Sequence, residues 1–329
     1  MQTRSILFTG PDQVELADVE VPAPGPGEIL LETVYSVVSP GTEIRCLEGG
    51  QPGSPDWPYI PGYSMVGRVV ARGEGASLEE GTLVFCAGTR KAGVALCWGG
   101  HIGHAVVPEA DAYVVPAGVD TVTAGMAHLV AIAVRGVRLT KPTLYCTVAV
   151  LGLGPIGQLS ARLFAATDAK TIAVDLVPER VQAAQSAGIR AYLAKGDPAE
   201  VVREFFPDGA DIVVDATGSP QAIHSSIAAA RDKPWDDSRD PGPRIVIQGS
   251  YPNELPIPYQ EAFLKEATFL LPRSCQPSDV RLVLELLADG RLRVGDIVSR
   301  VYAPAEAPKA YEALRRKDQN FLTVAFQWH

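Results

Sequence analysis

The chain has 329 residues, of which 47% are hydrophobic and 20% charged; this balance is typical of a globular protein with a sizeable core, and the length allows two domains. Its 29 Lys and Arg residues against 38 Asp and Glu residues leave a formal net charge of −9. Because no dense block of Lys and Arg interrupts this acidic background, binding to nucleic acid or to anionic membranes is not expected.

The first third of the chain predicts short strands separated by Pro/Gly turns, such as Pro22–Gly27 and Pro61-Gly62. This punctuation is typical of a compact, barrel-like β domain. The expected strands span residues 4–9, 28–38, 64–72, 81–86, 102–107 and 112–115.

The middle of the chain alternates strands with helical segments, which is the rhythm of a parallel sheet with helices on both faces. Six strands in this rhythm make a complete doubly wound sheet, so we expect an α/β protein. They are expected at residues 147–152, 171–175, 190–193, 211–216, 244–248 and 268–271.

The sequence also predicts the structure of two further segments. Residues 231–243 are polar and Pro-rich, which predicts a surface loop. The end of the chain predicts a helix at 278–289, a strand near 297–302, a helix at 306–316 and a strand at 321–327.

The most informative motif follows the first strand of the middle region. The apolar run Thr147–Leu151 leads into Gly-x-Gly-x-x-Gly, and an amphipathic helical pattern follows. In this setting the first glycine permits a tight turn, the second lets the backbone approach a pyrophosphate, and the third lets helix and strand pack closely. Free N–H groups at the helix N-terminus favour phosphate. We therefore predict dinucleotide binding by Gly152, Leu153, Gly154, Pro155, Ile156 and Gly157.

Asp175 at the end of the next apolar run indicates which dinucleotide is bound. A carboxylate there accepts hydrogen bonds from the ribose hydroxyls of NAD and repels a 2′-phosphate, so we predict NAD rather than NADP. FAD is disfavoured because its fingerprint usually stands at the start of a chain. Arg180, five residues on, is either a stacking partner of the adenine or a solvated helix residue.

Other features of the sequence indicate the cellular compartment in which the protein works. No apolar run is long enough to span a bilayer, and the first residues show no signal-like apolar region. The five cysteines are scattered without pairing motifs, as expected of a reducing compartment. We therefore expect a cytoplasmic enzyme.

The order of a β domain, a central nucleotide domain and a short return resembles the medium-chain dehydrogenase/reductase superfamily. Residues 24–32, 99–108 and 148–157 carry the resemblance. It implies a GroES-like β-barrel catalytic domain at 1–125, a Rossmann NAD-binding domain at 126–272, and a return to the catalytic domain at 273–329. It also implies a homodimer that pairs near 245–249 and 268–271, and strand ends that hold adenine and nicotinamide at Thr217, Gly249 and Ser250.

The zinc motifs of this superfamily are altered in the chain. Most of its alcohol dehydrogenases place zinc ligands in Cys-Gly-Thr/Ser-Asp and Gly-His-Glu, where this chain has Ser39-Pro-Gly-Thr-Glu43 and Pro61-Gly-Tyr-Ser64. Pro40 has no ligand atom, and the phenol of Tyr63 is a poor zinc ligand. The structural zinc of the family needs four cysteines close together, and the corresponding region supplies only Cys86 and Cys97. We therefore predict no metal, and the pairing resembles a zinc-independent branch that includes bacteriochlorophyllide dehydrogenases and sugar- or natural-product-tailoring enzymes.

Without zinc, side chains must stabilise the developing alkoxide and remove its proton. Tyr63 is the first candidate, although an ordinary tyrosine pKa of about 10 is high for a base; the alternative is a wall residue that fills the vacated metal site. His128 is the second candidate, with an ordinary pKa of about 6.5, and the alternative is a structural histidine. By resemblance Thr42 relays protons to solvent. Glu43 either orients that relay, compensates a cationic substrate or forms a structural ion pair.

Further aromatic and imidazole side chains complete the candidate set. Trp57 and Tyr59, together with Tyr63, are expected to stack on a flat or sugar-like substrate, or else to cover a barrel end. His101 and His104 are expected to be structural.

These residues lead to one main hypothesis and two alternatives. The main one is NAD-dependent, zinc-independent oxidation of a secondary alcohol to a ketone, or the reverse, on a bulky, sugar-like or natural-product substrate of secondary metabolism. An NADPH-type quinone or enone reductase of the same fold stays open, as does a nucleotide-binding protein without catalysis.

Overall fold

The computed structural model of the chain describes residues 1–236, 241–251, 254–316 and 321–329. These residues form two units: unit 1 comprises Met1–His128 and Val280–His329, and unit 2 comprises Leu129–Asp279. The chain crosses between them inside helices α3 (Ala127–Thr140) and α9 (Pro277–Ala288). The sequence-based boundaries after residues 125 and 272 lie a few residues earlier than these crossings.

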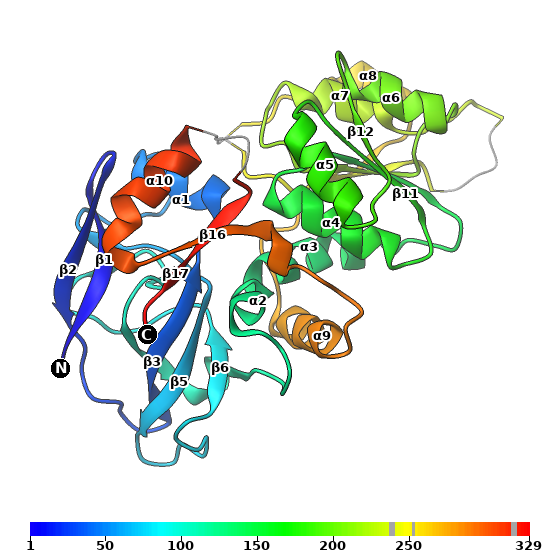
Figure 1. Cartoon of the computed structure of the whole chain (residues 1–329). Coiled ribbons are helices and arrows are strands. Elements are labelled where there is room, and N and C mark those ends of the chain that lie inside the picture. The colour runs from blue at the N-terminus through cyan, green and yellow to red at the C-terminus, as the bar shows by residue number, and fades with distance from the viewer. Residues whose placement is uncertain (237–240, 252–253, 317–320) are drawn as a thin grey trace. The chain divides into compact units, whose positions relative to one another are not determined.

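Unit 1 is built on two sheets (Figure 1). One has the strand order β2-β1-β4-β7, and the other has the order β16-β17-β3-β5-β6-β9 with β8 also paired to β3. Strand β17 pairs antiparallel with β3, so the C-terminal return completes the sheet of the first third of the chain. The strands are β1 (Gln2–Gly10), β2 (Gln13–Glu20), β3 (Glu28–Val37), β4 (Tyr59–Ile60), β5 (Met65–Arg72), β6 (Leu83–Cys86), β7 (Ala95–Leu96), β8 (His104–Pro108), β9 (Tyr113–Val114), β16 (Val298–Tyr302) and β17 (Thr323–Gln327).

Short helices connect these strands: α1 (Pro40–Leu47), α2 (Thr121–Gly125), α10 (Ala307–Arg315) and the 3-10 helices η1 (Glu109–Asp111), η2 (Gly295–Ile297) and η3 (Pro304–Glu306). Sequence patterns had not indicated β2 or α1. Strand β2 is largely exposed and alternates acidic with apolar residues, so it lacks a continuous apolar run. Helix α1 begins at Pro40-Gly41, a pair typical of turns; proline nevertheless fits the first position of a helix because its N–H would be unpaired there.

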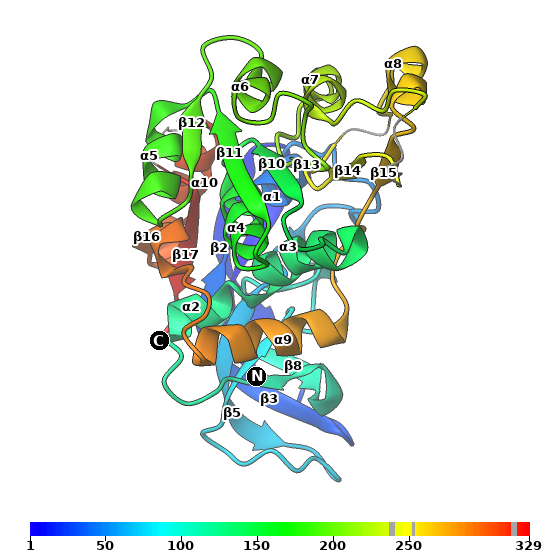
Figure 2. The same cartoon turned by 90° about the vertical axis from the view of Figure 1, so that its right-hand side faces the viewer.

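Unit 2 contains the predicted doubly wound sheet (Figure 2). Its strand order is β12-β11-β10-β13-β14-β15, and every pairing is parallel. The strands are β10 (Thr147–Leu151), β11 (Lys170–Asp175), β12 (Ala191–Leu193), β13 (Ile212–Asp215), β14 (Arg244–Ile247) and β15 (Thr268–Leu270). The helices between them are α4 (Pro155–Ala165), α5 (Pro178–Ser186), α6 (Pro198–Phe205), α7 (Ala222–Ala229) and α8 (Tyr259–Leu264).

Both faces of this sheet are buried, as a doubly wound sheet requires. Alternate residues of β10 belong to different cores: Val148 and Val150 pack with Phe164 of α4, whereas Ala149 and Leu151 pack with Ile223 of α7. Because all strands run the same way, their carboxyl ends lie along one edge of the sheet, which is where ligands of such sheets bind.

The segment 231–243 differs in part from the predicted surface loop. Its described residues, 231–236 and 241–243, form no helix or strand, and residues 237–240 lie outside the described part of the chain. Arg231, however, is buried, and its Nε lies 2.8 Å from Oδ1 of Asp211. An ion pair therefore holds the start of this segment against the sheet, which the polar composition did not indicate.

Among the described residues, no helix combines the length and the apolar composition needed to cross a bilayer.

Candidate active site

The hydroxyl of Tyr63 is the centre of a small polar cluster in unit 1. It donates a hydrogen bond to Oγ of Ser39 and lies 3.3 Å from Oγ1 of Thr42. Ser39 immediately precedes α1 and Thr42 lies in its first turn, so one helix start supplies both partners. Burial raises the pKa of Tyr63 to about 12. The phenol is therefore protonated at neutral pH and can donate a hydrogen bond to a substrate oxygen.

The backbone around Tyr63 is held by its two neighbours. Gly62 has φ +86°, and a Cβ at this position would approach the ring of His101 to 2.6 Å, so only glycine fits. Oγ of Ser64 donates a hydrogen bond of 2.7 Å to the carbonyl of Gly125, at the end of α2. Ser64, which departs from the residue often found in the family, thus ties the Tyr63 loop to the segment that leads to His128.

Two rings contact the Tyr63 ring. The ring centroid of His128 lies 4.8 Å away, and that of Trp98 lies 5.1 Å away in an edge-on arrangement. Burial lowers the pKa of His128 to about 4, so the imidazole is neutral at physiological pH and can accept a proton. Trp98 has φ +71° and follows Cys97 in an irregular loop. No periodic pattern marks that loop, and the sequence therefore did not indicate Trp98 as a site residue.

Glu43 lies beneath this cluster and is fully buried. Its Oε1 accepts a 2.7 Å hydrogen bond from the backbone N–H of Ser39, its Oε2 lies 2.8 Å from Nε2 of His101, and the hydroxyl of Tyr311 donates to Oε2. His101 in turn places Nδ1 2.8 Å from Oγ of Ser36. With no exposed atom, Glu43 is placed to orient Ser39 rather than to meet a substrate. Tyr311, which comes from α10, was not indicated by any local motif.

The predicted aromatic pair is present, but its two members differ in access. The rings of Trp57 and Tyr59 are stacked at 4.6 Å. Tyr59 is fully buried and its hydroxyl donates a 2.8 Å hydrogen bond to the carbonyl of Cys46. This corrects the expectation for Tyr59: it packs in the core of unit 1 and offers no face to a substrate, whereas Trp57 is partly exposed.

In unit 2 the glycine-rich turn has the geometry that the motif predicts for a pyrophosphate. Gly152 has φ +86°, and a Cβ on Gly157 would lie 1.7 Å from the carbonyl oxygen of Gly152, so turn and helix are in backbone contact. The Cβ position of Gly154 has no atom within 4 Å, which leaves open space before the N-terminus of α4. Pro155 and Ile156 begin that helix, and Leu153 is buried beneath the turn. The turn therefore fits a dinucleotide phosphate.

Asp175 lies directly beside this turn. Its carboxylate accepts hydrogen bonds from the backbone N–H of Leu153 and, at 2.8 Å, from that of Val177. Arg180 places Nη1 3.8 Å from Oδ2 of Asp175, so its guanidinium faces the acid and is not merely a solvated helix residue. The carboxylate has lone pairs left for ribose hydroxyls, and its charge opposes a second anion.

The other predicted cofactor residues gather at the neighbouring strand ends. A Cβ on Gly152 would lie 3.0 Å from the backbone of Thr217, which follows β13. A Cβ on Gly249 would lie 2.7 Å from the backbone N of Gly218, and Ser250 is exposed beside them. Thr217 Oγ1 donates a 2.8 Å hydrogen bond to the buried Asp215, which also accepts from Tyr251. The carboxyl ends of β10, β11, β13 and β14 thus form one continuous edge in unit 2.

Comparison with known proteins agrees with this architecture. Residues 25–118 match the alcohol dehydrogenase GroES-like domain, and residues 155–289 match the domain described as zinc-binding dehydrogenase. The chain belongs to the medium-chain dehydrogenase/reductase superfamily. It is an oxidoreductase of the alcohol dehydrogenase type.

Relatives align along nearly the whole length of this medium-chain dehydrogenase. The 2-desacetyl-2-hydroxyethyl bacteriochlorophyllide A dehydrogenase of Cereibacter sphaeroides is 26% identical, with 100% of this chain and 99% of the relative covered. The L-galactonate-5-dehydrogenase of Escherichia coli is 26% identical, with 95% of each covered. The crystal structure of 2R,3R-butanediol dehydrogenase from Bacillus subtilis superposes with a TM-score of 0.85 at 20% identity, with 99% of each chain covered.

The residues that by resemblance correspond to the zinc positions of the superfamily do not offer the ligands that a zinc ion prefers. Pro40 has no donor atom, the hydroxyl of Tyr63 is engaged by Ser39 and Thr42, and that of Ser64 by the Gly125 carbonyl. Zinc prefers thiolate, imidazole or carboxylate ligands. In the described ranges, no three His, Cys, Asp or Glu side chains come together as a metal-binding group.

Replacement of Asp175 by alanine tests its predicted role toward ribose. We expect Asp175→Ala to weaken NAD binding and to narrow the difference in affinity between NAD and NADP, because the ribose hydroxyls lose an acceptor and a 2′-phosphate loses a repelling charge. Titration calorimetry with both nucleotides measures this. Glu204→Ala, which removes an exposed acid of α6, is the matched control. An unchanged preference in Asp175→Ala contradicts the assignment.

Proposed function

We propose that this protein is an NAD(H)-dependent, zinc-independent dehydrogenase that oxidises a secondary alcohol to a ketone, or catalyses the reverse reaction. The observation that carries the proposal is the hydroxyl of Tyr63, which is held by Ser39 and Thr42. By resemblance, Tyr63 stands at the position of a metal ligand in zinc-dependent dehydrogenases. A preorganised hydrogen-bond donor in a water-poor site can stabilise a developing alkoxide, which is the task that a metal ion otherwise performs.

The choice of NAD over NADP is supported by Asp175. Its carboxylate lies beside the glycine turn and close to Arg180, where the ribose of a nucleotide bound at Gly154 is expected. Gly152–Gly157, Thr217 and Gly249 would hold the rest of the cofactor. When bound, the nicotinamide ring supplies the hydride acceptor or donor.

The proton chemistry is assigned to two neighbouring side chains. In the oxidation direction Tyr63, protonated because its pKa is raised to about 12, turns its one O–H from Ser39 to the substrate oxygen and donates a hydrogen bond to it. His128, neutral because its pKa is lowered to about 4, accepts the alcohol proton. The hydroxyl of Thr42 relays this proton to solvent. Glu43 touches no reacting atom in this scheme and holds the Ser39 backbone in place.

The substrate class follows from the relatives and from the site walls. One relative is named for a bacteriochlorophyllide and another for the sugar acid L-galactonate, so we propose a bulky, sugar-like or natural-product alcohol, as in secondary metabolism. Trp57 is partly exposed and Trp98 is exposed. Their indoles offer flat apolar surfaces on which rings can stack. A reducing, cytoplasmic setting suits the five free cysteines.

One experiment tests the proposal as a whole. Purified protein is titrated with NADH and NADPH, its zinc content is measured by elemental analysis on the same sample, and NADH turnover is followed with a panel of polyols, secondary alcohols and their ketones. We expect tighter NADH binding, no stoichiometric zinc, and turnover with part of the panel. Stoichiometric zinc contradicts the metal-free scheme, and NADPH preference contradicts the ribose assignment. Tight NADH binding without any turnover refutes the dehydrogenase.

The two proton-exchanging residues make separable contributions. We expect Tyr63→Phe and His128→Gln each to lower turnover on the order of 100-fold with little change in NADH affinity. Since His128 titrates at about 4, wild-type alcohol oxidation should decline only as the pH falls toward that value, and His128→Gln should lose this decline. A pH–rate profile with its acidic limb at about 6.5, or full turnover in either variant, contradicts the assignment.

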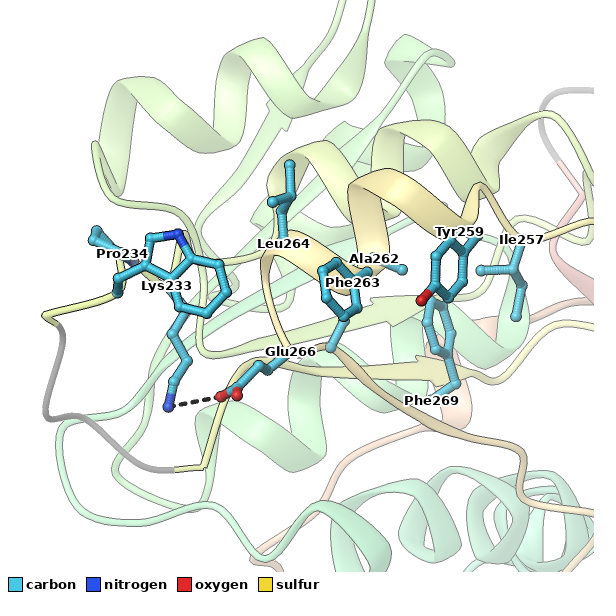
Figure 3. Close-up of a pocket in the computed structure, with 11 residues that line it drawn as sticks. Lys233, Pro234, Ile257, Tyr259, Ala262, Phe263, Leu264, Glu266 and Phe269 are labelled. Carbon is cyan, nitrogen blue, oxygen red and sulfur yellow. Dashed lines mark ion pairs between the residues drawn. The ribbon is translucent and has the colours of Figure 1, made fainter.

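We also propose that the protein is a homodimer, supported by an apolar surface on unit 2. Strand β15 forms one end of the described six-stranded sheet, and a pocket of about 730 Å³ lies beside it. Figure 3 shows Tyr259, Phe263 and Phe269 among its lining residues. Tyr259 is 73% exposed and Trp235 is 95% exposed. Large apolar side chains that are exposed together typically mark a surface that a partner covers.

Replacement of a central residue of this surface tests the dimer. We expect wild-type protein to sediment as a dimer and Phe263→Asp to weaken association by at least about 30-fold, because a buried charge replaces an apolar contact. Phe205→Asp, at a partly exposed phenylalanine on α6 that does not line this pocket, is the matched control. A monomeric wild type, or a dimer unaffected by Phe263→Asp, refutes the proposed surface.

A further inference from the structure

Cys46 and Cys97, separated by 51 residues in the sequence, bring their sulfur atoms to 3.9 Å. Cys46 lies in the last turn of α1 and Cys97 directly follows β7. Oγ of Ser54 lies 4.0 Å from the sulfur of Cys46 and 3.7 Å from that of Cys97. Both cysteines are buried free thiols, whereas Ser54 above them is partly exposed.

The backbone on both sides of the pair is tied to the same short strand, β4. The N–H of Cys97 donates a 2.9 Å hydrogen bond to the carbonyl of Ile60. On the other side, the hydroxyl of Tyr59 donates a 2.8 Å hydrogen bond to the carbonyl of Cys46. The two backbone positions that carry the sulfur atoms are therefore both held by hydrogen bonds to β4.

The two thiols are not equivalent. The hydrogen bond from Cys46 lowers the pKa of the Cys97 thiol. The same hydrogen bond and burial raise the pKa of the Cys46 thiol. Cys97 is also the more accessible of the two, at 5% exposure against 0% for Cys46. Because the thiolate is the nucleophilic form of cysteine, Cys97 is the member that reacts first with an electrophile. Cys46, at contact distance, is placed to resolve the product.

Both cysteines adjoin the residues that hold Tyr63. Cys97 precedes Trp98, whose indole contacts the Tyr63 ring at a centroid distance of 5.1 Å. Cys46 shares α1 with Thr42, whose hydroxyl lies 3.3 Å from that of Tyr63. A disulfide has an S–S distance of about 2.05 Å, so bond formation requires the two segments or their side chains to move closer together.

We propose that Cys46 and Cys97 form a dithiol that a small hydroperoxide oxidises to a disulfide, and that this bond displaces Trp98 from the Tyr63 ring and α1 from the Tyr63 hydroxyl and so lowers turnover. The Cys97 thiolate attacks a peroxide oxygen, the O–O bond breaks, and the departing hydroxide takes up a proton to leave as water (as an alcohol from an organic hydroperoxide). The Cys46 thiol then attacks the sulfur of the Cys97 sulfenic acid, the S–O bond breaks, and a water leaves. Two thiols lose two electrons and one peroxide gains them. The disulfide itself is independent of the proposed function, and only its effect on turnover rests on it.

Peptide mapping tests the bond directly. Full-length protein, reduced and desalted, is treated with hydrogen peroxide, alkylated and digested with trypsin without reduction. Cleavage after Arg and Lys places Cys46 in peptide 46–68, Cys97 in 92–135 and Cys86 in 73–90, each with a single cysteine. We expect a cross-link between the first two peptides and an unmodified Cys86, whose thiol has a pKa raised to about 12 by burial. Absence of the cross-link, or oxidation of Cys97 to acids alone, refutes the dithiol.

Turnover and variants test the consequence. We expect peroxide to lower wild-type turnover by at least about tenfold and dithiothreitol to restore it, with NADH binding unchanged. Cys97→Ser and Cys46→Ala should each keep their own turnover in peroxide, and Cys86→Ser, the matched control, should respond as wild type does. If circular dichroism shows that one of the two variants, Cys97→Ser or Cys46→Ala, does not fold, the other variant alone tests the prediction. A cross-link without loss of turnover refutes the displacement of the site. If no alcohol is turned over at all, the proposed function is refuted, but the peptide map still shows whether Cys46 and Cys97 form a disulfide.

Discussion

The candidate site of unit 1 depends on the buried carboxyl group of Glu43. Removing a carboxylate from water is costly unless hydrogen-bond partners replace the solvent. Here the Ser39 N–H, His101 and Tyr311 do so, and they come from a helix start, an irregular loop and the C-terminal helix α10. A single side chain therefore joins segments up to 268 residues apart. Because Ser39 also accepts the hydrogen bond of Tyr63, the geometry of the catalytic candidate follows from this burial.

In the proposed mechanism a hydrogen-bonded phenol and a neutral imidazole divide a task that one metal ion can perform alone. A metal ion polarises the substrate oxygen and lowers the pKa of its proton together. In this protein burial shifts the two candidate groups in opposite directions, raising the pKa of Tyr63 and lowering that of His128. Desolvation penalises the charged form of each group, so the phenol remains a donor and the imidazole an acceptor. Burial thus keeps both groups neutral, as the proposed acid–base pair requires.

The two units differ in how their sites are assembled. In unit 2, residues 147–175 contain a strand, the glycine turn, a helix and the acid that contacts the turn, so the predicted phosphate site lies within one βαβ unit. In unit 1, Tyr63, Ser39, His128 and Trp98 come from four separate segments, and their contacts exist only once two sheets have packed. Sequence reasoning was correspondingly more informative about the cofactor than about the catalytic groups.

The sequence by itself determined the α/β class, the six-strand rhythm and the dinucleotide turn, because apolar periodicity and glycine spacing act over a few residues. By resemblance alone it also placed Tyr63 and Ser64 at positions where zinc-dependent dehydrogenases have other residues. Only the tertiary structure decided that Tyr59 is a buried core residue, that Glu43 faces His101 and Tyr311, and that Cys46 meets Cys97. These contacts join residues 13 to 268 positions apart. Their partners are selected by the packing of whole strands and helices, which no local pattern encodes.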